Sequence, residues 1–155
     1  MAGQFDHAGA LVSRSLELEP TLVWSWDRSG WLNAYSGDTE TAVSHFEQAT
    51  RLDPRPNPGR LIGLGCAYFD AGRYEEAARL KRAALRGDPN TAWINRTLSV
   101  SYVRLGDRLA ALDSIEALRR YSPDMTIGKI VSALPFTQDF LDRVAVALDD
   151  LGVSA

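Results

Sequence analysis

Four prolines recur along the chain at nearly constant spacing, and this feature constrains the fold more than any other. Pro20, Pro54, Pro89 and Pro123 are separated by 34, 35 and 34 residues, and the sequence between them recurs in phase. A period of about 20–50 residues is typical of arrays in which similar units stack on their neighbours. We therefore expect a single domain, residues 1–155, built from repeated units.

Small residues occupy matching positions in three units of 34 residues, 23–56, 58–91 and 92–125. Glycine recurs at position 15 of each unit and alanine at position 20: Gly37, Gly72 and Gly106, then Ala42, Ala77 and Ala111. Glycine readily adopts the left-handed conformation that ends a helix, and alanine lets two helices approach closely. Proline near the end of each unit stops a second helix. The pattern predicts pairs of antiparallel helices and an all-α chain.

The shared positions resemble those of the tetratricopeptide repeat, over about two thirds of the chain. The resemblance implies a right-handed superhelical solenoid of antiparallel helix pairs. Residues 3–20 match the second half of a repeat whose first helix is missing. Residues 126–152 carry two more helical patterns, which we expect to form a C-terminal cap with Arg143 on its polar outer side. Lys81 stands where the repeat usually has a large apolar residue, so we expect looser packing in the second repeat.

Other residues are similar to the C-terminal tetratricopeptide region of bacterial class III adenylate/guanylate cyclases and related winged-helix regulators. These residues are Trp24, Trp26, Gly30 and Trp31, the stretch 63–77, the ending Leu134, Pro135 and Phe136, and the final Leu151 and Gly152. The resemblance implies that a cyclase or DNA-binding part lies upstream of this sequence. It makes the chain the tail of a larger bacterial signalling protein.

Composition excludes several classes of partner. The formal net charge is −3, whereas a protein that neutralises many phosphates is normally basic, so we expect no nucleic-acid partner. No apolar run approaches the ~20 residues that a transmembrane helix needs, and we expect no membrane association. The single cysteine, Cys66, fits a reducing compartment. The expected location is cytoplasmic.

No motif for catalysis, metal or cofactor binding stands out, and we expect no cofactor and no enzyme activity. The two histidines, His7 and His45, have no neighbouring ligands at metal-binding spacing. Gly59, Gly63 and Gly65 lack the strand that precedes a phosphate-binding loop. Cys66 has no histidine nearby in sequence to activate it as a nucleophile.

The resemblance places the first helix of each repeat on a concave groove. The inward positions of these helices are expected to hold the partner-binding residues: Trp24, Asp27, Trp31, Tyr35, Ile62, Cys66, Phe69, Asp70, Trp93, Arg96 and Arg104. Aromatic residues are enriched in binding hot spots, although packing between repeats is an alternative role, for Trp24 above all. Trp26 is expected in the core. Chaperone adaptors of the family grip a carboxylate with lysine and asparagine, where this chain has Asp27 and Trp31, so that function is not expected.

The predicted function is therefore binding of a protein or peptide partner in an aromatic groove. Two alternatives remain open: a regulatory region of a cyclase, and a scaffold that self-associates. The N-terminal half repeat favours a homodimer, because Phe5, Leu11, Val12 and Leu16 lie on a helix whose natural partner helix is missing.

Overall fold

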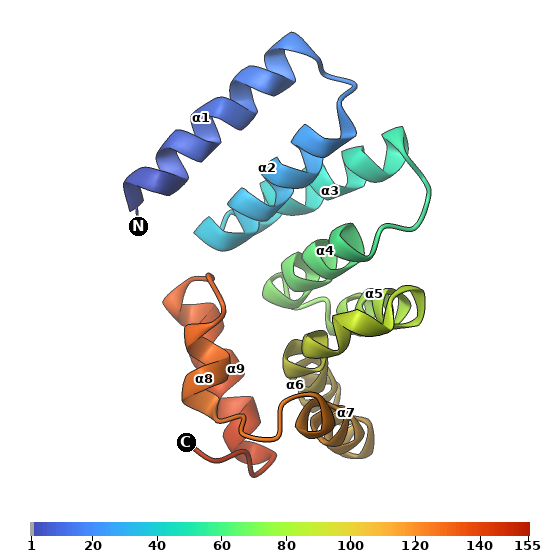
Figure 1. Cartoon of the computed structure of the whole chain (residues 1–155), viewed down its shortest axis with the longest axis vertical. Coiled ribbons are helices and arrows are strands. Elements are labelled where there is room, and N and C mark those ends of the chain that lie inside the picture. Colours follow the sequence, from blue (N-terminus) through green and yellow to red (C-terminus); the bar gives the residue numbers. More distant parts are fainter. Residues whose placement is uncertain (1) are drawn as a thin grey trace.

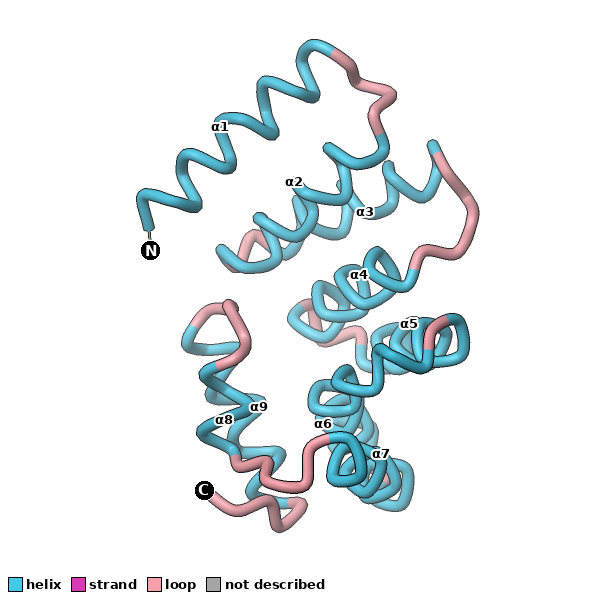
Figure 2. The backbone as a smooth tube through the Cα atoms, in the orientation of Figure 1, coloured by secondary structure: helices cyan, strands magenta, loops and turns pink. Residues whose placement is uncertain are grey.

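The computed structural model describes the backbone of residues 2–155 and the side chains of residues 7–155. Every regular element in this part of the chain is a helix, as Figures 1 and 2 show. The elements are α1 (Ala2–Leu18), α2 (Val23–Ser36), α3 (Thr39–Leu52), α4 (Pro58–Asp70), α5 (Tyr74–Gly87), the 3-10 helix η1 (Pro89–Ile94), α6 (Asn95–Leu105), α7 (Arg108–Tyr121), α8 (Ile127–Ser132) and α9 (Gln138–Asp150). The predicted all-α solenoid is confirmed.

Short polar side chains and glycines set the helix ends. Asp38, Asn57 and Asp107 each accept a hydrogen bond from the backbone N–H three residues further on, which satisfies a donor that the helix cannot. Gly37 ends α2 with φ 84°, a left-handed conformation that strains any residue with a Cβ. These local signals fix the helix pairs along the chain.

The helices pack as antiparallel pairs, α2 with α3, α4 with α5, and α6 with α7, and each pair contacts the next. Figure 1 shows α2, α4 and α6 following one another in a row, with α3, α5 and α7 to one side. Phe46 of α3 is fully buried at the junction of the first two pairs. A Cβ at Gly63 of α4 would lie 2.4 Å from Phe46 Cζ, so glycine allows this close approach.

The third repeat begins differently from its predicted start at Ala92. The segment from Pro89 to Ile94 forms η1, and α6 starts only at Asn95. The side chain of Asp88 accepts a hydrogen bond of 2.9 Å from the N–H of Asn90 and so begins the 3-10 segment. Trp93 therefore lies on η1, before α6.

Lys81 is fully buried, and the looser packing expected around it is wrong. Its Nζ donates hydrogen bonds of 3.2 Å to the Thr97 carbonyl oxygen and to Ser101 Oγ, which joins α5 to α6. The same ammonium lies 5.1 Å from the centroid of the Phe69 ring. Burial lowers the pKa of the Lys81 ammonium, because the charged form loses its hydration.

The helices α8 and α9 fold back along the row of inner helices (Figure 1). Phe140 of α9 packs against Phe69 at the end of α4, with 5.2 Å between ring centroids. Arg143, expected on the outer side of a cap, instead forms an ion pair with Asp70 of α4, and the two side chains are 23% and 18% exposed. The α8–α9 hairpin therefore covers the C-terminal end of α4.

Among the described helices, none combines the length and the apolar character that a membrane-spanning segment requires.

Candidate functional site: the inner face of the solenoid

We call the surface formed by α2, α4, η1 and α6, between α1 at one end and α8–α9 at the other, the inner face. The connection between α8 and α9 reaches the end of α2, where Phe136 packs against Tyr35 with 5.2 Å between ring centroids. The C-terminal ends of α2 and α4 are thereby covered by the chain itself. The open part of the inner face lies toward the N-terminal ends of these helices.

Three residues predicted to bind a partner lie in the core instead. Ile62, Cys66 and Phe69 are 2%, 3% and 0% exposed, so no partner can contact them without unfolding the repeat. Ile62 and Cys66 pack in a cluster with Ile94, and Phe69 packs against Phe140. The predicted role of these three residues in partner binding is wrong, because neighbouring repeats and α9 occupy the space in front of them.

The two acidic residues predicted in the groove are held in ion pairs within the chain. Asp27 of α2 accepts hydrogen bonds of 2.7 and 3.0 Å from Arg60 of α4, which also donates to the Asp53 carbonyl oxygen at 2.7 Å. Asp70 binds Arg143 of α9 and accepts a hydrogen bond from Thr39. These carboxylates join helices of the chain itself. The prediction that Asp27 and Asp70 bind a partner is therefore wrong.

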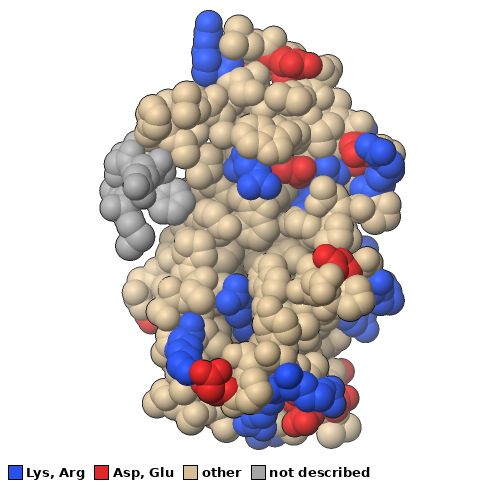
Figure 3. Space-filling model, in the orientation of Figure 1, with Lys and Arg blue, Asp and Glu red and all other residues tan. Residues whose placement is uncertain are grey.

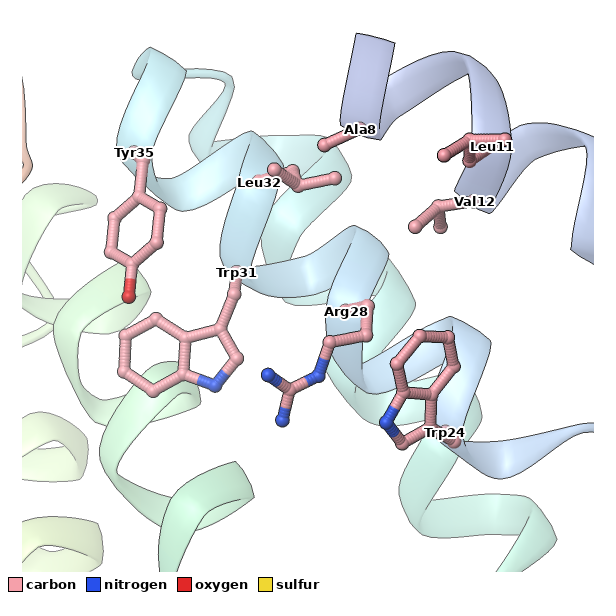
Figure 4. A pocket seen from close by; sticks show the side chains of 8 residues that line it. All are labelled: Ala8, Leu11, Val12, Trp24, Arg28, Trp31, Leu32 and Tyr35. Carbon is pink, nitrogen blue, oxygen red and sulfur yellow. The ribbon is translucent and has the colours of Figure 1, made fainter. Parts of the chain in front are cut away.

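One stripe of α2 lines an open pocket of about 410 Å³ between α1 and α2. Trp24, Arg28, Trp31 and Tyr35 are three or four residues apart and therefore share one helix face. The side chains of Ala8, Leu11, Val12 and Leu32 complete the lining. Figure 4 shows the Arg28 guanidinium between the two indoles, and the Tyr35 hydroxyl directed away from α1.

The two tryptophans of this pocket differ in exposure. Trp24 is 57% exposed, so the alternative that it packs between repeats is wrong. Trp31 is partly buried and meets Phe46 edge-on, with 5.8 Å between ring centroids. Trp24 is free to contact a partner, whereas Trp31 both lines the pocket and supports the packing of α2 on α3.

Trp26, expected in the core, is only partly buried. Its indole Nε1 donates a hydrogen bond of 2.8 Å to the Pro20 carbonyl oxygen, and the ring meets His45 edge-on at 5.0 Å. Trp26 therefore anchors the turn between α1 and α2.

Arg28 is the main residue of the pocket that the repeat pattern does not indicate. It lies 5.7 Å above the Trp24 ring, in a cation–π contact one helical turn away. The signal in the sequence is the spacing of four residues between a tryptophan and an arginine, which places both on one face of a helix.

A second tryptophan–arginine pair lies on η1 and α6. The Arg96 guanidinium is 4.9 Å from the centroid of the Trp93 ring, and both residues line a pocket of about 200 Å³ with Tyr121, Met125 and Ile130. Arg96 Nε is buried and has no hydrogen-bond partner among the described residues. Burial lowers the pKa of the Arg96 guanidinium, the effect expected of a cation removed from water. Arg104, also predicted in the groove, is exposed in the last turn of α6.

Tyr35 connects the two pairs electrostatically. Burial raises the pKa of the Tyr35 hydroxyl, and the positive charges of Arg28 and Arg96 both act against this rise. The two arginines therefore act on one tyrosine, which lies in the last turn of α2.

The described residues include no cluster of three or more histidine, cysteine, aspartate or glutamate side chains that could hold a metal ion. Ser29 Oγ and His45 Nδ1 are hydrogen-bonded at 2.8 Å, but Ser29 is 8% exposed at the contact between α2 and α3. This pair links two helices.

Comparisons with known proteins agree with the repeat pattern. The family model described as "Tetratricopeptide repeat" matches residues 29–92 and 62–100. Anaphase-promoting complex subunit 3 of Schizosaccharomyces pombe is 27% identical over 152 residues, which are 96% of this chain and 23% of that protein. Small glutamine-rich tetratricopeptide repeat-containing protein 2 of Mycosarcoma maydis is 24% identical over 102 residues, or 64% of this chain and 29% of that protein.

The chain therefore spans less than a third of the length of these two relatives. Among solved structures, the crystal structure of MamA superposes with a TM-score of 0.72 and 19% identity, covering 97% of this chain and 88% of that one. At this identity the structural likeness shows the fold alone.

Proposed function

We propose that this tetratricopeptide solenoid binds a protein or peptide partner on the open part of its inner face. Tetratricopeptide domains are generally protein-interaction modules. The observation that carries the proposal is Trp24, which is 57% exposed beside an open pocket of about 410 Å³. Exposed tryptophans next to apolar pockets are the residues on which binding energy concentrates.

Affinity purification from the source cell, followed by a direct binding measurement, tests the proposal. A partner recovered with the unmodified chain should be lost with Trp24→Ala, at an expected cost of about 2 kcal/mol or more in binding. Leu109→Ala is the matched control, because Leu109 is 78% exposed on α7, outside the inner face. Equal binding by Trp24→Ala and Leu109→Ala would overturn the proposal.

Self-association through α1 is a second candidate. Leu11 and Leu18 of α1 are 60% and 69% exposed, so this helix presents apolar side chains that the chain leaves uncovered. Val12, expected on the dimer surface, is 8% exposed and faces the pocket with α2. The side chain of Phe5 lies outside the described residues. Leu11 and Leu18 therefore replace Phe5 and Val12 as the residues to test.

A narrower proposal follows from the resemblance to bacterial cyclases. In this proposal the solenoid is the cytoplasmic C-terminal tail of a signalling protein, and the inner face receives the regulatory partner. Its support is the resemblance in sequence alone. The DNA sequence directly upstream of the Met1 codon tests it. An encoded cyclase or winged-helix domain in the same reading frame would support the proposal, and an in-frame stop codon would overturn it.

A further inference from the structure

The inner helices carry an excess of positive charge, although the whole chain has a net charge of −3. The elements α2, α4, η1 and α6 contain two acidic residues, Asp27 and Asp70, and four arginines, Arg28, Arg60, Arg96 and Arg104. Both acids are neutralised within the chain, by Arg60 and by Arg143 of α9. Figure 3 shows basic side chains scattered among mostly uncharged residues over the middle of the molecule.

Of the other three arginines, Arg104 is exposed in the last turn of α6, and Arg28 and Arg96, like it, have no carboxylate partner among the described residues. Each instead lies near a tryptophan, Arg28 at 5.7 Å from the Trp24 ring and Arg96 at 4.9 Å from the Trp93 ring. A contact with an aromatic face uses no N–H group of the guanidinium, so its donors stay available to a bidentate acceptor.

Arg96 gives a separate indication that a ligand group is missing. Its Nε is buried and donates no hydrogen bond within the part of the chain that the structure describes, whereas buried polar atoms in folded proteins nearly always have a partner. The Arg96 side chain lines the pocket of about 200 Å³ that Trp93 also lines. A carboxylate entering this pocket would neutralise this partly desolvated cation.

We propose that the partner of the inner face is an acidic segment, with carboxylates that bind Arg28 and Arg96 and an apolar side chain that enters the pocket between α1 and α2. This inference rests on the proposed function, since it names the chemistry of the partner at the same surface. A carboxylate is the anion that an unmodified protein offers, either on aspartate and glutamate side chains or at its C-terminus. Charge complementarity of this kind chiefly determines which partner is accepted.

A selection from random peptides tests the inference, because it does not require the natural partner to be identified first. A display library of twelve-residue peptides is selected against the full chain, against Arg28→Gln/Arg96→Gln and against Trp24→Ala. We expect the full chain to enrich peptides that combine aspartate or glutamate with a large apolar residue. The double variant should lose this preference for acidic residues, and Trp24→Ala should lose the enriched peptides altogether.

One enriched peptide is then synthesised with a fluorescent label, and its dissociation constant is measured by fluorescence anisotropy. Replacing each glutamate by glutamine should weaken binding about tenfold per contact, and Arg28→Gln or Arg96→Gln should do the same. Arg82→Gln on the exposed face of α5 is the matched control and should leave affinity unchanged. Peptides with an amidated C-terminus show whether the carboxylate comes from the chain end or from side chains.

The outcomes separate this inference from the proposed function. Enriched peptides without acidic residues, bound equally by the double variant and lost with Trp24→Ala, would overturn the acidic partner and leave the binding face in place. Peptides that bind Trp24→Ala as well as the full chain, or no enrichment at all, would overturn both. A circular dichroism spectrum of each variant with unchanged helix content excludes unfolding as the cause.

Discussion

A single lysine is the least expected residue of the core. Lys81 is fully buried and donates to Thr97 O and Ser101 Oγ. Ser101 Oγ itself donates to the Thr97 carbonyl oxygen at 3.0 Å, so that acceptor would keep a partner without the lysine. A charged group taken out of water without a carboxylate beside it destabilises the folded state.

We predict that Lys81→Met stabilises the chain by about 1–3 kcal/mol, because methionine fills similar space and removes the buried ammonium. Thermal and urea unfolding measure the change. Arg82→Met is the control, since the neighbouring Arg82 is exposed. A clear loss of stability in Lys81→Met would mean that the two hydrogen bonds outweigh the desolvation of the ammonium.

The same residue predicts how stability depends on alkaline pH. Burial lowers the pKa of Lys81 below its usual 10.5. Between the two pKa values the unfolded chain binds more protons than the folded one, so the free energy of unfolding rises with pH across that window. Lys81→Met should lack this rise, and parallel pH profiles of the two proteins in urea titrations would refute the assignment.

His45 predicts the behaviour at acid pH. Burial lowers its pKa below 6.5, and the Asp38 carboxylate opposes that shift only in part. The unfolded chain then binds more protons as the pH falls through 6.5, so stability is lost on acidification through this range. His45→Gln should flatten the loss between about pH 7.5 and pH 5. Equal slopes for His45→Gln and the unmodified chain in urea unfolding would contradict this.

At the scale of one element, α9 packs against α6 and α8 and is joined to α4 by an aromatic contact and an ion pair. Phe140 is 1% exposed and lies between Phe69 and Phe136, with ring centroids 5.2 and 4.2 Å away. We predict that Phe140→Ala destabilises the chain by about 3–5 kcal/mol through the cavity it leaves. Val146→Ala on the same helix, where Val146 is 60% exposed, should change stability little. Chemical denaturation measures the stability of both variants. Similar losses of stability would mean that Phe140 is not on the buried side of α9.

The sequence predicts the helices well and their packing only in part. Helix ends follow from local chemistry, as at Asp38, Asn57 and Gly37, because caps act over a few residues. The side of a helix that is apolar also follows from the spacing of its residues. The element that this side will contact does not, because periodicity contains no information about the partner.

The wrong predictions at the site have the same cause, since each depends on which element a helix contacts. Phe69 faces inward as the repeat pattern predicts, but α9 covers it. Arg143 looks like a surface residue from its position in α9, since its partner Asp70 is 73 residues away in the sequence. Arg28 is missing from the predicted groove because the repeat pattern assigns no inward role to its position, although it does assign one to Trp24 and Trp31 on either side.

At the scale of the molecule, the exposed leucines of α1 predict self-association. Leu18 is 69% exposed and does not line the pocket between α1 and α2, so it separates dimer formation from partner binding. We predict a dimer whose dissociation is favoured by Leu18→Glu and not by Leu109→Glu on α7. Sedimentation velocity over a wide concentration range measures this. An unmodified chain that remains monomeric at high concentration would exclude the dimer.

The return of α9 onto α4 also affects how the molecule is made. In an open solenoid each repeat contacts only its neighbours, so the chain can fold unit by unit as it leaves the ribosome. Here the Asp70 carboxylate gains its ion-pair partner only when Arg143 has been synthesised, 73 residues later. Until then Phe69 lacks its contact with Phe140, and the end of α4 exposes apolar surface. During synthesis, the growing chain therefore passes through a stage in which its repeats are formed and its inner face is still unfinished.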